Sequence, residues 1–474
     1  MPSTLYQEFV SHLPDSPSDS QGDFIVRFER FLLRKEKKSA FILRGYAGTG
    51  KTAAIAALVK SLPLLNWRTV LLAPTGRAAK VVSKNSKKSA FTIHKKIYFT
   101  KRDASGKFMM HRADNRHKDT LFIIDESSMI SGRNYNEYSN HSSSLIDDLI
   151  QYVYSGENCR AVFVGDIAQL PPIDLDISPA LDPQFLKSNY NIGLNGCVMK
   201  DVLRQKRRSG ILHNATILRE QLEQDEFKIQ LRTKFFEDVK NISGLDLEDH
   251  LENSISKYGL NEVKIICRSN KSANAYNQQF RVRILGLEDE ITTADQIMVV
   301  KNNYYWLDDS DHIGFIANGD IASIERITNV QELYGFKFAD AHLRFIDYPD
   351  AIPVEAKILL NTLNEDHASL SMEKSQSLFK AVMEDYMHIK SKKERLEMIK
   401  KDPYYNALQV KFAYALTCHK AQGGQWKSVF VDQGYLTEEL VDLNYLRWLY
   451  TAVTRAEERL FFVNFHPNFT EVET

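Results

Sequence analysis

At 474 residues and 43% hydrophobic content, the chain is long enough for about three domains, which excludes a single small domain. Its 61 basic residues balance 61 acidic residues, so the total charge gives no hint of nucleic acid, which would bind a local groove. No apolar run could span a bilayer and segment 1–21 lacks a signal-peptide pattern, so we expect a cytoplasmic protein without a membrane partner.

Short apolar runs rich in β-branched residues alternate with helical stretches, which predicts parallel βαβ units. The first set of predicted strands is 40–43, 69–72, 121–124 and 161–164. A second set indicates a second α/β core, with strands at 263–267, 413–416, 429–431 and 460–463 and a helix over 271–285. Between its halves, short strands and turn residues such as Asn318-Gly319 indicate an inserted, partly β domain.

The segment that follows the first predicted strand carries a nucleotide-binding pattern. Gly45 to Thr52, GYAGTGKT, fits G-x-x-x-x-G-K-[ST] and precedes an alanine-rich helix. Glycines let backbone N–H groups surround phosphates, Lys51 reaches the outer phosphates, and the Thr52 hydroxyl binds Mg²⁺. A glycine-rich turn without a ligand is the alternative. Nucleoside triphosphate contacts are expected from Gly45, Ala47, Gly48, Thr49, Gly50, Lys51 and Thr52.

Acidic and amide side chains follow the next strands of the same predicted sheet. Asp125 and Glu126 come directly after strand 121–124. Open α/β sheets bind ligands at this end of their strands, so Asp125 would hold Mg²⁺ and Glu126 would polarise the attacking water. Gln169 follows strand 161–164 and would sense the γ-phosphate, unless its segment is only a proline-braced turn.

Two further features concern single segments. Residues 95–119 lie between two predicted strands of the first core and have apolar flanks around Asp103-Ala104-Ser105-Gly106, which predicts a protruding β-hairpin. The cysteines are scattered without metal-ligand spacing, so we expect them to be buried and to hold neither a metal nor a disulfide. They are Cys159, Cys197, Cys267 and Cys418.

Taken together, these segments resemble a superfamily 1 helicase of the RecD/Dda type, in branch 1B. The resemblance covers most of the chain and rests on motifs at 45–52, 73–80, 92–94, 125–129, 165–169, 203–205, 268–271, 417–423 and 450–456. It implies two RecA-like P-loop NTPase domains. The first is residues 1–195 with a pin hairpin at about 95–119, the second is 196–285 with 409–474, and 286–408 form an inserted SH3-like barrel.

The same resemblance implies that ATP with Mg²⁺ binds between the two cores. Arg204 and Arg455 would stabilise charge on the γ-phosphoryl oxygens in the transition state. Gln21 would read adenine, although it also suits a polar helix start. Gln422 and Gly424 would also contact ATP. The catalytic set is then Lys51, Glu126, Gln169, Arg204 and Arg455.

Nucleic acid is expected to cross both cores, through phosphate contacts that do not read sequence. Aromatic residues of the hairpin could stack on bases, or could simply pack the hairpin itself. The expected contacts are Pro74, Thr75, Thr92, His94, Tyr98, Phe108, Ser269, Asn270, Thr417, His419 and Lys420.

The predicted function is that of a monomeric, ATP-dependent single-stranded DNA translocase and helicase, with 5′-to-3′ polarity implied by the resemblance. Its partners would be single-stranded DNA and single-strand/duplex junctions, with single-strand-binding or repair-complex proteins, near the nucleoid. Three alternatives stay open: a remodeller of protein–DNA complexes or motor subunit of a larger repair complex, an RNA-directed helicase, and a nucleotide switch without hydrolysis. Segments 130–157 and 334–386 match the family less clearly.

Overall fold

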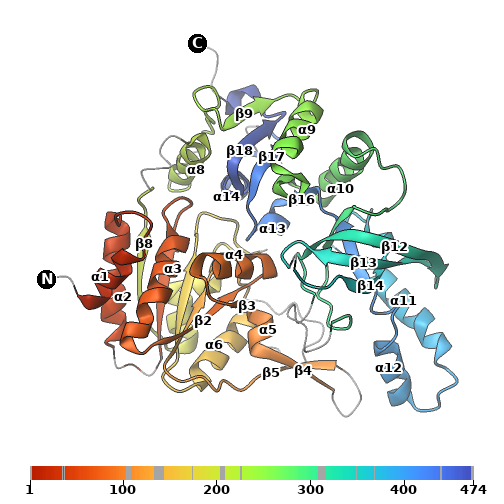
Figure 1. Cartoon of the computed structure of the whole chain (residues 1–474), viewed down its shortest axis with the longest axis horizontal. Coiled ribbons are helices and arrows are strands. Elements are labelled where there is room, and N and C mark those ends of the chain that lie inside the picture. The colour runs from red at the N-terminus through yellow and green to blue at the C-terminus, as the bar shows by residue number, and fades with distance from the viewer. Residues whose placement is uncertain are drawn as a thin grey trace.

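The structure is a computed structural model that describes residues 3–34, 36, 38–102, 108–132, 144–172, 174–202, 209–224, 227–307, 316–348, 350–367, 369–437 and 440–470. Two α/β cores and a β-barrel surround a common junction, with the first core at the lower left of Figure 1 and the second above it. Among these residues, we find no helix with the length and apolar character that crossing a bilayer requires. All four cysteines are buried, as expected.

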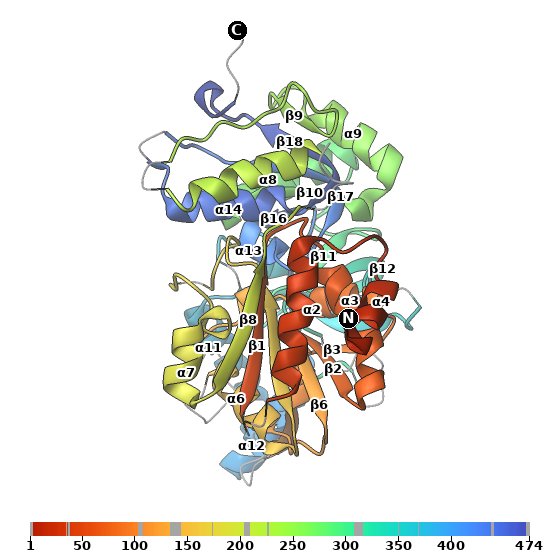
Figure 2. The ribbon, with the colours of Figure 1, turned by 90° about the vertical axis from the view of Figure 1, so that its left-hand side faces the viewer.

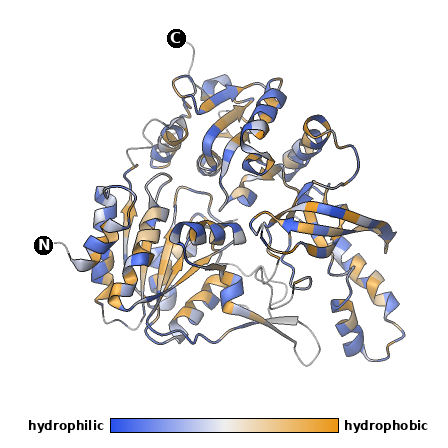
Figure 3. Cartoon of the chain, in the orientation of Figure 1, coloured by the Kyte–Doolittle hydropathy of each residue, from blue (hydrophilic) through white to orange (hydrophobic). Residues whose placement is uncertain are grey.

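The first core is a six-stranded parallel sheet in the order β3-β2-β6-β7-β1-β8. Its central strands are buried on both faces, and Figure 3 shows hydrophobic residues concentrated on them. The strands are β1 Ser39–Gly45, β2 Arg68–Ala73, β3 Ala90–Thr92, β6 Thr120–Ile124, β7 Arg160–Gly165 and β8 Gly193–Met199. The helices are α1 Thr4–Ser11, α2 Asp19–Leu32, α3 Lys51–Ser61, α4 Gly76–Ser86, α5 Ile93–Ile97, α6 Leu145–Ser155 and α7 Pro183–Tyr190.

The second core is a five-stranded parallel sheet in the order β16-β10-β17-β18-β9. Its strands are β9 Val239–Ile242, β10 Val263–Cys267, β16 Ala415–Thr417, β17 Trp426–Asp432 and β18 Ala456–Val463. Its helices are α8 Gly210–Gln221, α9 Leu247–Tyr258, α10 Asn270–Gln279, α13 Cys418–Ala421 and α14 Leu443–Val453. The helix predicted over 271–285 is α10 followed by a π-helix, Phe280–Ile284. The two predicted α/β cores are confirmed.

The inserted domain is a closed barrel of five strands, which confirms the prediction of an inserted barrel. Its strands are β11 Gln296–Val299, β12 Ile321–Leu333, β13 Phe336–Phe345, β14 Val354–Leu359 and β15 Leu408–Phe412. Between β14 and β15 the chain forms α11 Met372–Asp385 and α12 Lys392–Lys400, which pack on the barrel through a separate apolar cluster. Most of segment 334–386 therefore belongs to the barrel and α11.

Two strands cross the domain boundaries predicted from the sequence. Strand β8 begins before residue 195 and pairs with β1 along its whole length, so the first sheet extends to Met199. Strand β15 pairs with β11 and β14, so the barrel extends to Phe412.

The predicted hairpin is present as β4 Tyr98–Arg102 and β5 Phe108–Arg112, which pair antiparallel. Its turn, residues 103–107, lies outside the described residues, as does 133–143 of the polar segment 130–157. The base of the hairpin is tied to α6, because the Tyr98 hydroxyl donates to Asp148 Oδ2 at 2.7 Å and Arg112 donates to Asp148 Oδ1 at 3.2 Å. The hairpin is therefore anchored to the first core.

Candidate nucleotide and nucleic-acid sites

The nucleotide motifs meet at the carboxyl ends of β1, β6 and β7, which are neighbours at the centre of the first sheet. Lys51 is the first residue of α3, and its Nζ donates to the carbonyl oxygens of Gly45 at 2.7 Å and Tyr46 at 2.9 Å. The same Nζ lies 3.9 Å from Asp166 Oδ2. The ammonium is thus held at the P-loop by weak neutral acceptors and one carboxylate.

The P-loop touches the second core directly. Gly48 has φ of 75°, a conformation that favours glycine, and a Cβ there would lie 2.7 Å from Leu212 Cδ2 on α8, so the leucine would have to shift. Arg219, also on α8, lies over the Tyr46 ring at 4.5 Å from its centroid. Figure 2 shows α8 and α14 above the ends of β1 and β8. The second core therefore forms the opposite wall of the site.

Asp125 and Glu126 form an acidic pair beside Lys51. Burial and the neighbouring Glu126 raise the pKa of Asp125, while Lys51 lowers it. The Glu126 N–H donates to Asp125 Oδ1 at 2.9 Å, and Glu126 has φ of 50°. The Thr52 hydroxyl and the Asp125 carboxylate are oxygen ligands of the kind that Mg²⁺ prefers.

Gln169 lies in a loop that the second core holds from both sides. Its side chain is buried, and its Oε1 has no hydrogen-bond partner among the described residues. The next residue, Leu170, donates its N–H to Thr451 Oγ1 at 2.8 Å and accepts from Gln422 Nε2 at 2.7 Å. Gln422 therefore lies at the contact between the two cores, next to the buried side chain of Gln169.

Of the two predicted arginines, only Arg455 is among the described residues, and its side chain bonds within the second core. Arg204 lies in the segment 203–208, outside them. Arg455 is 3% exposed and donates to the carbonyl oxygens of Thr451 and Gly424, both in the second core. The roles of these arginines and of Gly424 in hydrolysis stay predictions.

Gln21 is buried near the start of α2. Its Oε1 accepts the N–H of Ser18, and the Ser18 hydroxyl accepts the N–H of Gln21, so the pair forms a capping box. The polar helix start is thus present, and adenine recognition by Gln21 stays a prediction.

Three of the predicted nucleic-acid contacts are N-caps of helices. The hydroxyls of Thr75, Thr92 and Ser269 accept the N–H of the residue three positions on, at the starts of α4, α5 and α10. Thr417 precedes α13 in the same way, without a side-chain cap bond. Helix N-termini carry partial positive charge and free N–H groups, which suits phosphate.

The two surfaces that carry these caps meet. A Cβ on Gly423 would lie 3.1 Å from Thr75 Oγ1. Lys420 donates to Asn318 Oδ1 in the barrel at 2.6 Å, and burial lowers its pKa to about 8. The segment around α13 therefore meets both the start of α4 and the barrel. Pro74 directly precedes Thr75, Asn270 directly follows Ser269, and His419 is exposed on α13.

Two predicted contacts are constrained by their surroundings. Burial lowers the pKa of His94 to about 4, which favours the neutral ring at neutral pH. Tyr98 is committed to Asp148 through its hydroxyl, which favours hairpin packing, one of the two interpretations left open for it. Phe108 begins β5 next to the hairpin turn.

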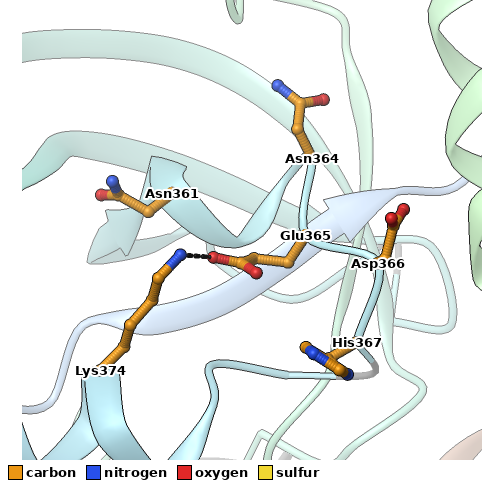
Figure 4. A pocket seen from close by; sticks show the side chains of 6 residues that line it. All are labelled: Asn361, Asn364, Glu365, Asp366, His367 and Lys374. Carbon is orange, nitrogen blue, oxygen red and sulfur yellow. Dashed lines mark hydrogen bonds and ion pairs between the residues drawn. The ribbon is translucent and has the colours of Figure 1, made fainter.

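A separate pocket of about 440 Å³ lies beside the barrel, away from the P-loop (Figure 4). The Lys374 ammonium points at the Glu365 carboxylate and pairs with it. Within the described ranges, no three His, Cys, Asp or Glu side chains are grouped so that they could hold a metal ion. The pocket lining is Asn361, Asn364, Glu365, Asp366, His367 and Lys374.

Sequence analysis missed the tyrosine that joins the two cores. The hydroxyl of Tyr450, on α14, accepts the Ala47 N–H at 2.8 Å and donates to Asp166 Oδ2 at 2.7 Å. Tyr450 lies within the matched segment 450–456, so the motif marked its position, but only the fold reveals its partners.

Comparisons with known families match both cores. The model of the AAA domain matches residues 32–229, and that of the UvrD-like helicase C-terminal domain matches residues 412–463. The first match contains the P-loop and the acidic pair, and the second contains Arg455 and Tyr450.

Several relatives and one solved structure are similar to this chain. An uncharacterized protein of Acanthamoeba polyphaga mimivirus is 23% identical over 89% of this chain and 95% of its own length. The ATP-dependent RecD2 DNA helicase of Deinococcus radiodurans is 32% identical over 28% of this chain and 16% of its own. The ATP-dependent DNA helicase dda of phage T4 is 28% identical over 33% and 34%. The Bacteroides Pif1 helicase structure with ADP-AlF3 and single-stranded DNA aligns over 94% of both chains, at 13% identity and a TM-score of 0.47.

Two P-loop-type cores with a helicase C-terminal motif set define an ATP-hydrolysing helicase of superfamily 1. Within that class, the similarity to RecD2 and dda supports the 1B branch, which includes the RecD- and Dda-type proteins. The predicted family, fold class and enzyme class are confirmed.

Proposed function

We propose that this helicase moves along single-stranded DNA and separates duplex DNA ahead of it. The observation that carries this proposal is the contact between the cores, where Gly423, just after α13, lies against Thr75 at the start of α4, while Tyr450 of α14 binds the P-loop. Opening or closing of the ATP-binding cleft between the two cores would then change the distance between the surfaces that hold the DNA strand. Two relatives that are named DNA helicases support DNA as the substrate.

In the proposed cycle, Lys51 leaves the carbonyl oxygens of Gly45 and Tyr46 and binds the outer phosphates of ATP. Thr52 and Asp125 would hold Mg²⁺, which neutralises phosphate charge when it is bound. Glu126 would accept the proton of the attacking water, and the free Gln169 oxygen would orient that water. Arg204 and Arg455 would stabilise the transition state after the cleft rearranges.

The finer parts of the proposal follow the resemblance: 5′-to-3′ movement, action as a monomer, and a cytoplasmic site of action at the nucleoid with single-strand-binding or repair-complex partners. We expect unwinding of duplexes with a 5′ tail, because that polarity loads the motor on the 5′ strand. Strand displacement on matched 5′-tailed and 3′-tailed duplexes measures it. Unwinding of only the 3′-tailed duplex would contradict this prediction and indicate 3′-to-5′ movement.

The competing functions are separated by ATPase stimulation. We expect single-stranded DNA to stimulate hydrolysis more than RNA of the same sequence and length. Greater stimulation by RNA would favour an RNA-directed helicase, since phosphate contacts alone do not distinguish the two. Stimulation by DNA without strand displacement would favour a remodeller or a motor subunit, and nucleotide binding without turnover would indicate a switch.

The hairpin anchor yields a further prediction. Tyr98→Phe keeps the ring and removes the hydroxyl bond to Asp148, so we expect several-fold slower unwinding with unchanged DNA-stimulated ATPase. Tyr190→Phe is the matched control, because its hydroxyl binds Asp147 at 2.6 Å away from the hairpin. Unwinding as fast as in the control would mean that the anchor does not matter. Because the ring is retained, a loss would not reflect base stacking.

A further inference from the structure

Tyr450 joins two groups of the first core that lie far apart in the chain. It is 1% exposed, and its single hydroxyl both accepts the Ala47 N–H and donates to Asp166 Oδ2. Burial and the adjacent Asp166 raise the pKa of Tyr450, so the hydroxyl keeps its proton and remains a donor. The second core thus contacts the P-loop and the Asp166 carboxylate through one oxygen atom.

The Asp166 carboxylate lies near Lys51 and would compete with the phosphates of ATP for its ammonium group. It is 1% exposed, its Oδ1 accepts the Ala168 N–H at 2.9 Å, and its Oδ2 lies 3.9 Å from Lys51 Nζ. The Tyr450 hydroxyl bonds that same Oδ2 at 2.7 Å. A neutral donor therefore already binds the carboxylate oxygen that lies 3.9 Å from Lys51 Nζ. Buried carboxylates need such donors, because their desolvation is costly without them.

We propose that Tyr450 is a positioning residue through which the second core controls Lys51. With Tyr450 in place, Asp166 is satisfied and Lys51 can move to the phosphates. When α14 withdraws from the first core, Asp166 loses its donor and becomes the strongest partner for the Lys51 ammonium. Opening of the cleft then draws Lys51 away from the nucleotide, which couples core separation to nucleotide release. This inference rests on the proposed ATP-driven cycle and adds a residue to it.

The test is Tyr450→Phe, with Tyr445→Phe as the matched control. Tyr445 lies on the same helix, is 2% exposed, and its hydroxyl binds Gln433 Oε1 at 2.9 Å within the second core. We expect Tyr450→Phe to weaken binding of a fluorescent, non-hydrolysable ATP analogue with Mg²⁺ by about tenfold, since a bond to a buried charge is lost. The control should bind as the wild type does.

A second substitution separates the effect on Lys51 from lost packing. Asp166→Asn keeps the shape and removes the charge that attracts Lys51, so it should restore analogue affinity in the Tyr450→Phe background. Alone, Asp166→Asn should bind the analogue at least as tightly as the wild type. Equal affinity of Tyr450→Phe and Tyr445→Phe would overturn the proposal.

Weakened binding by Asp166→Asn alone would also overturn it, and this result does not depend on the folding of Tyr450→Phe. Both titrations are made without nucleic acid. If the wild type binds the analogue but unwinds no duplex, the proposed function fails while the role of Tyr450 is still decided by these affinities.

Discussion

Replacing Lys51 by methionine is expected to lower DNA-stimulated ATP hydrolysis by about 10³-fold, because the only ammonium that the P-loop motif supplies to the phosphates is lost. Methionine keeps the length and apolar stem of the side chain. The Tyr46 carbonyl oxygen, one of the two that Lys51 binds, still accepts from the Thr49 hydroxyl at 2.8 Å. The measurement is steady-state turnover with saturating single-stranded DNA, with the unfolding midpoint expected to change little.

Lys60→Met is the control for Lys51→Met, since Lys60 is exposed at the far end of the same helix. It should keep wild-type turnover. Lys51→Met turnover within tenfold of that control would show that hydrolysis does not use this P-loop.

Replacing Arg281 by methionine is expected to lower the free energy of unfolding by about 3–5 kcal/mol. Arg281 is 2% exposed and binds both carboxylate oxygens of Asp295, at 2.8 and 2.9 Å, while Asp295 is fully buried. The substitution strands a buried carboxylate that keeps only the Tyr414 hydroxyl and the Thr292 N–H as donors. Urea unfolding measures the change.

Arg283→Met is the control for Arg281→Met, because Arg283 pairs with Glu248 at the surface, with 60% of its side chain exposed. It should cost less than about 1 kcal/mol. If both substitutions destabilise the protein equally, the buried pair is not what stabilises this region.

The central strands could be predicted because strands buried on both faces read as continuous apolar runs, as in β1, β2, β6 and β7. The edge strand β8 could not, because its sequence, GLNGCVM, is interrupted by glycine and asparagine. A Cβ on Gly196 would lie 2.4 Å from the Ile42 carbonyl oxygen, so close pairing with β1 requires glycine there. Gly196 therefore allows β8 to pair with β1, and the same glycine interrupts the apolar run by which the strand would be recognised.

The nucleotide motifs could be located because each is a local pattern at the end of a strand. The contacts between cores could not, because Tyr450 lies 403 residues from Ala47 and 284 from Asp166 along the chain. Such pairs depend on how the two sheets face each other, and no spacing rule encodes that. The capping roles of Thr75 and Ser269 could be predicted only in part. The residue types that favour N-cap positions can be recognised in a sequence, but the residue at which the helix starts must also be known.

The bonds around Asp295 have a mechanical consequence. The chain enters the barrel just after Asp295 and leaves it just before Tyr414, whose hydroxyl binds Asp295 at 2.9 Å and accepts the Gln296 N–H at 2.9 Å. Arg281, beyond the end of α10, clamps the same carboxylate. The two chain connections between the second core and the barrel are thus held together at Asp295. We therefore expect the barrel and the second core to move together as one unit.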